Sequence, residues 1–217
     1  MGEYKVHAYE YTTNSQGADH LSGGSAFSKN VNPLDPGIRS RRSIRIKDFD
    51  YSAPGAYFVT ICAERRECLF GQVRDAAVRL TDAGEMIAAE WRELPRRFPF
   101  VELDVFQVMP NHVHGVLFLG CRGESCIRPK ESGEHEVRPY GTLPGSLARV
   151  IQAFKSITTS RYIAGVRSRG WEPFVRKVWQ RNYYEHVIRN ESDLADIRDY
   201  IGENPARWAE DEYNPAK

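Results

Sequence analysis

The sequence is poor in cysteine and has no long apolar run, and each lack excludes a class of protein. Four cysteines among 217 residues are too few for a disulfide scaffold, and the spacings from Cys62 to Cys68 and from Cys121 to Cys126 miss the usual CxxC of a zinc site. No segment offers the roughly 18 apolar residues of a membrane helix, and the first residues lack the apolar stretch of a signal peptide. These absences favour a soluble cytoplasmic protein without a membrane partner.

The sequence does contain enough apolar and aromatic residues for one sizeable core, at 41% and 12% of the chain. Residues 1–37 are polar, with clusters of Gly, Ser and Asn, and are expected to form a flexible tail. Residues 38–212 are then expected to form one domain, followed by a short tail at 213–217. A polar stretch at about 120–141, broken by Gly and Pro, predicts a disordered loop inside that domain.

The net charge of +1 conceals two blocks of opposite sign. Residues 147–181 hold eight basic side chains and one acid, a balance of +7, whereas residues 185–212 hold nine acids and three arginines, a balance of −6. Such blocks are usually solvated faces. The basic block also carries Tyr162, Trp171 and Trp179, and this combination fits a groove that binds a nucleic-acid backbone and stacks its bases. Charge alone leaves both interpretations open.

Hydrophobic periodicity predicts a mixture of helices and strands. The expected elements, in chain order, are a strand at 57–62, a hairpin at 69–80, a helix capped by Thr81 or Asp82, two strands within 103–119, a helix capped by Ser146, a strand and turn at 178–188, and a helix from Asn190 to Pro205. This order predicts an α+β domain with helices over a mostly antiparallel sheet.

Two histidines in the strand-like stretch 103–119 are the first candidate for chemistry. Successive side chains of a strand alternate between its faces, so His112 and His114 point the same way and can converge on one divalent metal. Pro110 cannot donate to a central ladder and predicts a break that aims the pair. Two half-buried sheet histidines bonded to their neighbours would give the same pattern, because two ligands alone do not define a metal site.

The last predicted helix carries a second candidate. Tyr200 and Asn204 lie one helical turn apart on one face, so a phenol and an amide oxygen that can bind a hard cation are neighbours. A helix tyrosine and a capping asparagine before Pro205 would look alike in the sequence.

Together the motifs resemble a known family. Met-Pro-Asn-His112-Val-His114 followed by Tyr200-Ile-x-x-Asn204-Pro is similar to the IS200-like single-tyrosine transposases of the HUH (His-hydrophobic-His) class, in the REP-associated tyrosine transposase branch. Residues 41–45, 179–186 and 188–191 also resemble the family, so the likeness spans about 40–212 outside the polar stretch. Many relatives carry Gln where this chain has Asn204.

The resemblance implies a ferredoxin-like antiparallel sheet and an enzyme that cuts and rejoins single-stranded DNA beside an imperfect, REP-like hairpin in a bacterial nucleoid. His112, His114 and Asn204 would bind Mg²⁺ or Mn²⁺. Tyr200 would attack phosphorus and give a 5′-phosphotyrosine with a departing 3′-OH. Candidate DNA contacts are Arg41, Arg42, Arg45, Lys155, Arg161, Arg181, Tyr184 and Arg189. A homodimer and a monomer are both compatible with the family.

Several alternatives remain at the sequence level. Tyr183 and Tyr184 are rival nucleophiles, although neighbours on a strand face opposite ways and only one of them can face a metal. A metal-dependent phosphodiesterase that activates water, or a domesticated protein that only binds DNA hairpins, would also fit. A histidine-triad hydrolase does not fit, because position 116 is Val instead of a third histidine.

Overall fold

A computed structural model of the chain describes residues 54–120 and 145–217. Its elements, in order, are β1 (Gly55–Cys62), the 3-10 turn η2 (Glu64–Arg66), β2 (Gly71–Arg74), β3 (Ala77–Leu80), α1 (Asp82–Arg92), α2 (Leu94–Arg97), β4 (Val101–Val108), β5 (His112–Leu119), α3 (Leu147–Arg169), β6 (Tyr184–Ile188), α4 (Glu191–Glu203) and η4 (Trp208–Glu210). The predicted tail at 1–37, the polar stretch after Gly120, and Arg41, Arg42 and Arg45 lie outside the described residues.

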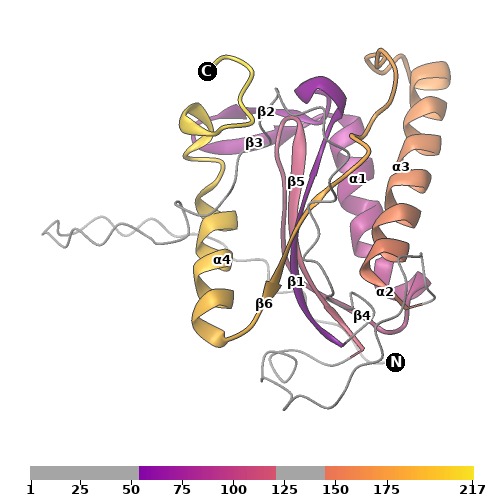
Figure 1. Cartoon of the computed structure of the whole chain (residues 1–217). Coiled ribbons are helices and arrows are strands. Elements are labelled where there is room, and N and C mark those ends of the chain that lie inside the picture. The colour runs from indigo at the N-terminus through magenta and orange to yellow at the C-terminus, as the bar shows by residue number, and fades with distance from the viewer. Residues whose placement is uncertain (1–53, 121–144) are drawn as a thin grey trace, which may run out of the picture. The chain divides into compact units, whose positions relative to one another are not determined.

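The described residues form a four-stranded antiparallel sheet with the strand order β4-β5-β1-β6. Helices α1 and α3 cover one face of this sheet and α4 lies over the other, while β2 and β3 pair separately (Figure 1). Leaving that hairpin aside, the chain runs strand, helix, two strands, helix, strand, which is the ferredoxin-like order. The predicted α+β fold, with helices packed on an antiparallel sheet, is therefore confirmed.

The two central strands are buried along their whole length because both of their faces are covered. Every residue of β1 and of β5 is buried. The alternating side chains of Tyr57, Val59 and Ile61 face α1 and α3 and join the main core there. The opposite face of the same strands carries Thr60 and the histidines. One strand pair thus builds the core and presents polar groups to α4.

The sequence signals at the helix ends are confirmed. The caps predicted for α1, α3 and α4 accept hydrogen bonds from backbone N–H groups of the first turn, Thr81 at 3.2 Å, Ser146 at 3.3 Å and Asn190 at 2.8 Å. Helix α4 ends at Glu203, one residue before the Asn204-Pro205 pair that the sequence predicted as its end.

The strand and following turn predicted at 178–188 occur in the opposite order, because β6 begins only at Tyr184, after a loop. A lysine on α3 binds this loop. The Lys155 ammonium donates to the carbonyls of Gln180 at 3.0 Å and of Asn182 at 2.9 Å. The Trp179 indole, which donates to Thr158 Oγ1 at 2.9 Å, fixes the start of the loop.

A close approach between β5 and α1 gives a stability prediction. A Cβ at Gly115 would lie 2.4 Å from Cζ2 of the buried Trp91 ring, which Phe106 stacks on at 4.6 Å between centroids. Gly115→Ala is therefore expected to lower the free energy of unfolding by about 1–3 kcal/mol, as overpacking does. Urea unfolding measures the change. Gly55→Ala is the control, because a Cβ there meets Tyr57 at an ordinary 3.4 Å. Equal stability of the two variants would contradict this packing.

Candidate active site

The two histidines of β5 converge. His112 and His114 lie on the face of the sheet that α4 covers, since the His114 ring contacts Tyr200 of that helix, and their Nε2 atoms are 2.9 Å apart. Their ring centroids are 4.5 Å apart at an interplanar angle of 75°. The alternation of strand side chains predicted a shared face. The two rings are also inclined toward each other, so that their Nε2 atoms are neighbours.

Hydrogen bonds to the other ring nitrogens orient the pair. His112 Nδ1 donates to Asn111 Oδ1 at 2.8 Å, and because an amide oxygen only accepts, Nε2 of that ring keeps a bare lone pair. His114 Nδ1 lies 2.8 Å from Thr60 Oγ1, a hydroxyl that can either accept or donate. When Thr60 accepts a hydrogen bond from His114 Nδ1, the Nε2 atoms of both histidines carry lone pairs that face the same point, as two metal ligands require.

Burial keeps both imidazoles neutral. His112 is 0% and His114 1% exposed. Burial lowers the pKa of His114 to about 3, and burial together with the neighbouring His114 and Arg66 charges holds the pKa of His112 well below its ordinary value. The pair is therefore in the protonation state that binds a metal.

These pKa shifts make the metal-free protein less stable in mild acid. The histidines of the unfolded chain bind protons near pH 6.5, whereas His114 of the folded chain stays neutral down to about pH 3. The unfolded state is therefore stabilised relative to the folded state as the pH falls below about 6.5. Each such histidine contributes a slope of up to about 1.4 kcal/mol per pH unit. Urea midpoints between pH 7.5 and 5 measure this loss, which His114→Gln should reduce. A midpoint that stays constant over this range would contradict the burial of neutral imidazoles.

Helix α4 places the Tyr200 side chain next to the histidine pair. The Tyr200 ring lies 5.3 Å from the His114 ring and 6.1 Å from the Phe58 ring between centroids. Burial raises the pKa of its hydroxyl, and the charges of Asp211 and Glu212 raise it further. A hydrogen bond from the Asn204 side chain acts in the opposite direction. At neutral pH the hydroxyl is protonated, so it needs a positive charge or a base to become a nucleophile.

Asn204, one turn after Tyr200, caps the end of α4 and is 4% exposed. Its side chain lowers the pKa of both the Tyr200 hydroxyl and the Asp211 carboxyl group. Its Oδ1 atom is buried and has no hydrogen-bond partner among the described residues. A buried acceptor of this kind is a candidate metal ligand, because an unpaired amide oxygen is costly to bury.

The residues fit a divalent metal ion. Two nitrogen ligands at about 2.1 Å from one ion and at right angles to each other lie about 3 Å apart, close to the 2.9 Å between the two Nε2 atoms. The orphaned Asn204 oxygen supplies the kind of third ligand that hard cations prefer. No cluster of three or more His, Cys, Asp or Glu occurs within 54–120 and 145–217.

A C-terminal segment, residues 208–213, covers His112. The His112 ring lies 4.7 Å from the Tyr213 ring and 6.0 Å from the Trp208 ring between centroids. Asn111 Nδ2 donates to the Tyr213 carbonyl at 2.7 Å, and the Arg66 guanidinium lies 5.2 Å above the Tyr213 ring. Tyr213, the first residue of the expected C-terminal tail, is 8% exposed. This segment therefore covers the His112 ring, whereas Tyr200 and Phe58 lie next to the His114 ring.

Sequence reasoning missed the residues that support the site, namely Thr60, Asn111, Trp208, Asp211 and Tyr213. Asn111 carried a usable signal, because it directly precedes His112 and an amide is a common partner for a ligand histidine. Thr60 and Tyr213 gave none, because their contacts join stretches that are 54 and 102 residues away in the chain.

The predicted DNA contacts divide between the two faces of the sheet. Tyr184 pairs with Thr60 across the ladder and therefore lies on the histidine face, while Arg181 and Arg189 are exposed just outside β6. On the other face, the Lys155 ammonium binds loop carbonyls, and Arg161 forms an ion pair with the buried Glu90 at 2.8 Å. The role of these residues in DNA binding stays a prediction.

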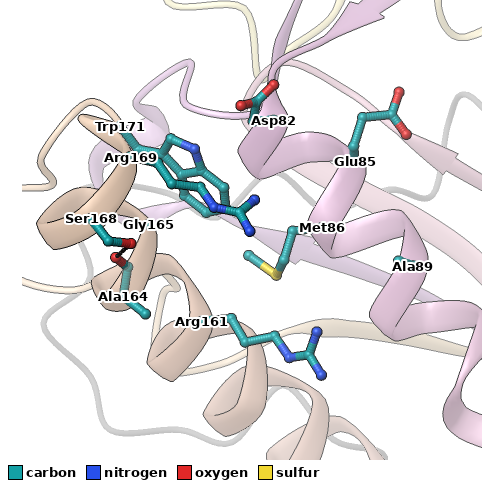
Figure 2. A pocket seen from close by; sticks show the side chains of 10 residues that line it. All are labelled: Asp82, Glu85, Met86, Ala89, Arg161, Ala164, Gly165, Ser168, Arg169 and Trp171. Carbon is teal, nitrogen blue, oxygen red and sulfur yellow. Dashed lines mark hydrogen bonds between the residues drawn. The ribbon is translucent and has the colours of Figure 1, made fainter.

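A groove of about 640 Å³ lies between α1 and α3 (Figure 2). Asp82 and Glu85 stand on its α1 side, and Arg161 and Arg169 on its α3 side. Because these helices cover the face opposite to α4, the groove is separate from the histidine pair. No helix among the described residues is both long and apolar enough to span a membrane.

Comparison with known proteins finds no matching family model but several relatives. A Haemophilus influenzae protein described as uncharacterized is 37% identical over 178 residues, which cover 81% of this chain and 94% of that protein. A putative REP-associated tyrosine transposase of the same organism is 23% identical over 158 residues, 73% of this chain and 74% of that protein.

Two solved structures are also similar in part. A REP-associated tyrosine transposase bound to a REP hairpin matches with a TM-score of 0.46 and 22% identity, over 79% of this chain and 74% of that one. A putative transposase from Deinococcus radiodurans matches with a TM-score of 0.39 and 16% identity, over 72% and 95%.

The His-Val-His pair on a sheet strand, with a tyrosine helix packed over it, is the arrangement that the resemblance to the HUH class implies. The chain is similar to the IS200-like REP-associated tyrosine transposases in its motifs and in its match to a distant relative of that description. The resemblance noted in the sequence is thereby confirmed.

Proposed function

We propose that this protein cuts and rejoins single-stranded DNA next to a hairpin through a covalent bond to Tyr200. The observation that supports the proposal best is the convergence of separate stretches of the chain: two neutral imidazoles 2.9 Å apart between their Nε2 atoms, with a phenol ring 5.3 Å from one of them. The REP hairpin in the solved relative supports a hairpin as the DNA feature that is bound.

The chain's own residues prepare the reaction. His112, His114 and the Asn204 oxygen would hold Mg²⁺ or Mn²⁺, which when bound would polarise the scissile phosphate and stabilise the departing oxygen. Asn111 and Thr60 fix the two rings so that the Nε2 atoms face inward. The Asn204 side chain lowers the pKa of the Tyr200 hydroxyl and so favours its ionised, nucleophilic form.

The chemical step exchanges one phosphate ester for another. The Tyr200 oxygen bonds to phosphorus as the bond to the 3′ oxygen breaks; the phenol loses its proton to solvent, and the departing oxygen takes one up as a 3′-OH. The phosphate remains bound as a 5′-phosphotyrosine, so attack by a 3′-OH of another strand reverses the exchange without an energy source. We expect DNA to reach this place only after residues 208–213 move aside, because both histidines are buried and this segment covers His112.

The direct test is a covalent adduct. The full chain is incubated with a single-stranded oligonucleotide that carries a palindrome from the flanks of its gene and with Mn²⁺, and the mixture is separated under denaturing conditions. A protein–DNA band that depends on metal supports the proposal. Salt-dependent DNA binding without any adduct would favour a hairpin-binding protein that does not cleave.

A further inference from the structure

The turn that follows β1, residues 63–66, has a strained backbone close to the histidine pair. Arg65 and Arg66 both have a φ of 58°, a left-handed conformation that is unfavourable for residues other than glycine. The turn is joined to the segment before β5, because the Ala63 N–H donates to the Asn111 carbonyl at 2.7 Å. Strained residues persist where the surrounding structure fixes them, and they are concentrated at functional sites.

The main chain of Arg66 is tied to His112 through one residue. Asn111 Nδ2 donates to the Arg66 carbonyl at 3.0 Å, and Asn111 Oδ1 accepts from His112 Nδ1 at 2.8 Å. Neither of these two bonds involves the C-terminal segment, residues 208–213, that covers His112. We therefore expect the Arg66 main chain to stay beside the histidine pair when that segment moves aside.

The Arg66 side chain, by contrast, contacts the covering segment. Its Nη1 atom donates to the Glu212 carbonyl, and the guanidinium lies 5.2 Å from the centroid of the Tyr213 ring. The Tyr213 ring in turn lies 4.7 Å from the His112 ring between centroids. One aromatic ring thus separates a permanent positive charge from a candidate metal ligand. Both contacts of the guanidinium are lost if the segment leaves.

We propose that Arg66 exchanges the covering segment for the scissile phosphate: its guanidinium binds the non-bridging phosphate oxygens and stabilises their negative charge while the ester is exchanged. This inference rests on the proposed function, because it adds a cationic group to that same site. A guanidinium suits the task, since its planar N–H groups can bind two phosphate oxygens at once and it stays protonated. Arg66 transfers no proton, and the bonds that form and break are those between phosphorus and the two ester oxygens.

The first test is the single-turnover rate of cleavage with Mn²⁺, with the full chain in excess over a labelled single-stranded oligonucleotide that carries a palindrome from the flanks of its gene. Arg66→Met keeps an unbranched apolar side chain and removes the charge. Cleavage should be about 100-fold slower, as when one group that stabilises transition-state charge is removed. An unchanged or a faster rate would mean that Arg66 only holds the cover in place, and would overturn the proposal.

Arg65→Met is the matched control. Arg65 is exposed, has the same φ in the same turn, and loses the same charge. Its cleavage rate should change little. Equal losses in the two variants would mean that the total charge of the turn matters instead of a contact made by Arg66, and would overturn the proposal. Circular dichroism checks folding, and Arg66→Gly, which suits a positive φ, replaces a variant that does not fold.

Two measurements without cleavage separate a phosphate contact from a structural role. In the absence of divalent metal, the slope of the logarithm of DNA affinity against the logarithm of salt concentration should become shallower by about 0.7 in Arg66→Met, the share of one phosphate contact on a single strand. The Mn²⁺ affinity without DNA should stay at the wild-type value. An unchanged slope, or a loss of Mn²⁺ affinity that accompanies the loss of cleavage, would overturn the proposal.

The wild-type chain separates this inference from the function on which it rests. If the wild-type chain forms no metal-dependent covalent adduct, the proposed function fails and the role of Arg66 fails with it. If the wild-type chain forms the adduct and Arg66→Met forms it at the same rate, only the role of Arg66 fails.

Discussion

Tyr200→Phe is expected to abolish the covalent protein–DNA adduct while DNA binding persists. The substitution removes one oxygen atom and keeps the ring that packs 5.3 Å from the His114 ring and 6.1 Å from the Phe58 ring. Without the hydroxyl no ester to phosphate can form, so the adduct band should disappear instead of weakening. Denaturing gels report the adduct, and fluorescence anisotropy with the same oligonucleotide reports binding.

Tyr184→Phe is the control for that experiment. Tyr184 is a second phenol on the histidine face, with its ring 6.1 Å from the Phe58 ring, whereas the neighbouring Tyr183 ring lies under the Lys155 ammonium at 5.4 Å. The adduct should form in Tyr184→Phe. An adduct that persists in Tyr200→Phe but is lost in Tyr184→Phe would show that Tyr184 is the nucleophile instead of Tyr200.

His112→Ala and His114→Ala are each expected to lose metal binding and DNA cleavage together. The two Nε2 atoms meet at 2.9 Å, so removing either one takes away half of the nitrogen ligands. The loss of Mn²⁺ affinity should exceed the roughly 100-fold upper range seen for partners of metal ligands. Isothermal titration calorimetry with Mn²⁺ and a cleavage assay with a labelled oligonucleotide measure the two losses on the same samples.

His186→Ala is the matched control for the histidine variants. His186 lies on β6 next to Phe58 in the ladder, and its ring nitrogen bonds Asp193 at 2.9 Å, so its replacement removes an imidazole from the same sheet without touching the pair. It should retain Mn²⁺ binding. Cleavage that continues in excess chelator, or that falls equally in all three variants, would remove the metal from the mechanism.

Much of the fold was predictable because its signals are local. Thr81, Ser146 and Asn190 lie next to the helices they cap, and the mostly apolar, β-branched and aromatic run of β1 needs only its own residues to be recognised. The shared face of His112 and His114 follows from strand geometry alone. Each of these features depends on residues within about one turn or one strand.

The features that sequence reasoning missed depend on contacts between distant stretches. The loop before β6 is bound by Lys155, which lies 27 residues before the Asn182 carbonyl that accepts its hydrogen bond. The neighbourhood of His114 and Tyr200 requires β1 to lie between β5 and β6 and α4 to return over that face. Hydrophobic periodicity along the chain does not predict this order of strands. Only the family resemblance suggested that the histidine motif and the tyrosine motif lie close together.

Asn111 has a further consequence for how the covered histidines become available. Its NH₂ group donates both to the Tyr213 carbonyl at 2.7 Å and to the Arg66 carbonyl at 3.0 Å, while its oxygen holds His112. Departure of the C-terminal segment breaks only the first of these bonds. The other two persist, so the imidazole is already preorganised when the cover lifts, and an arriving phosphate would not have to wait for that ring to reorient.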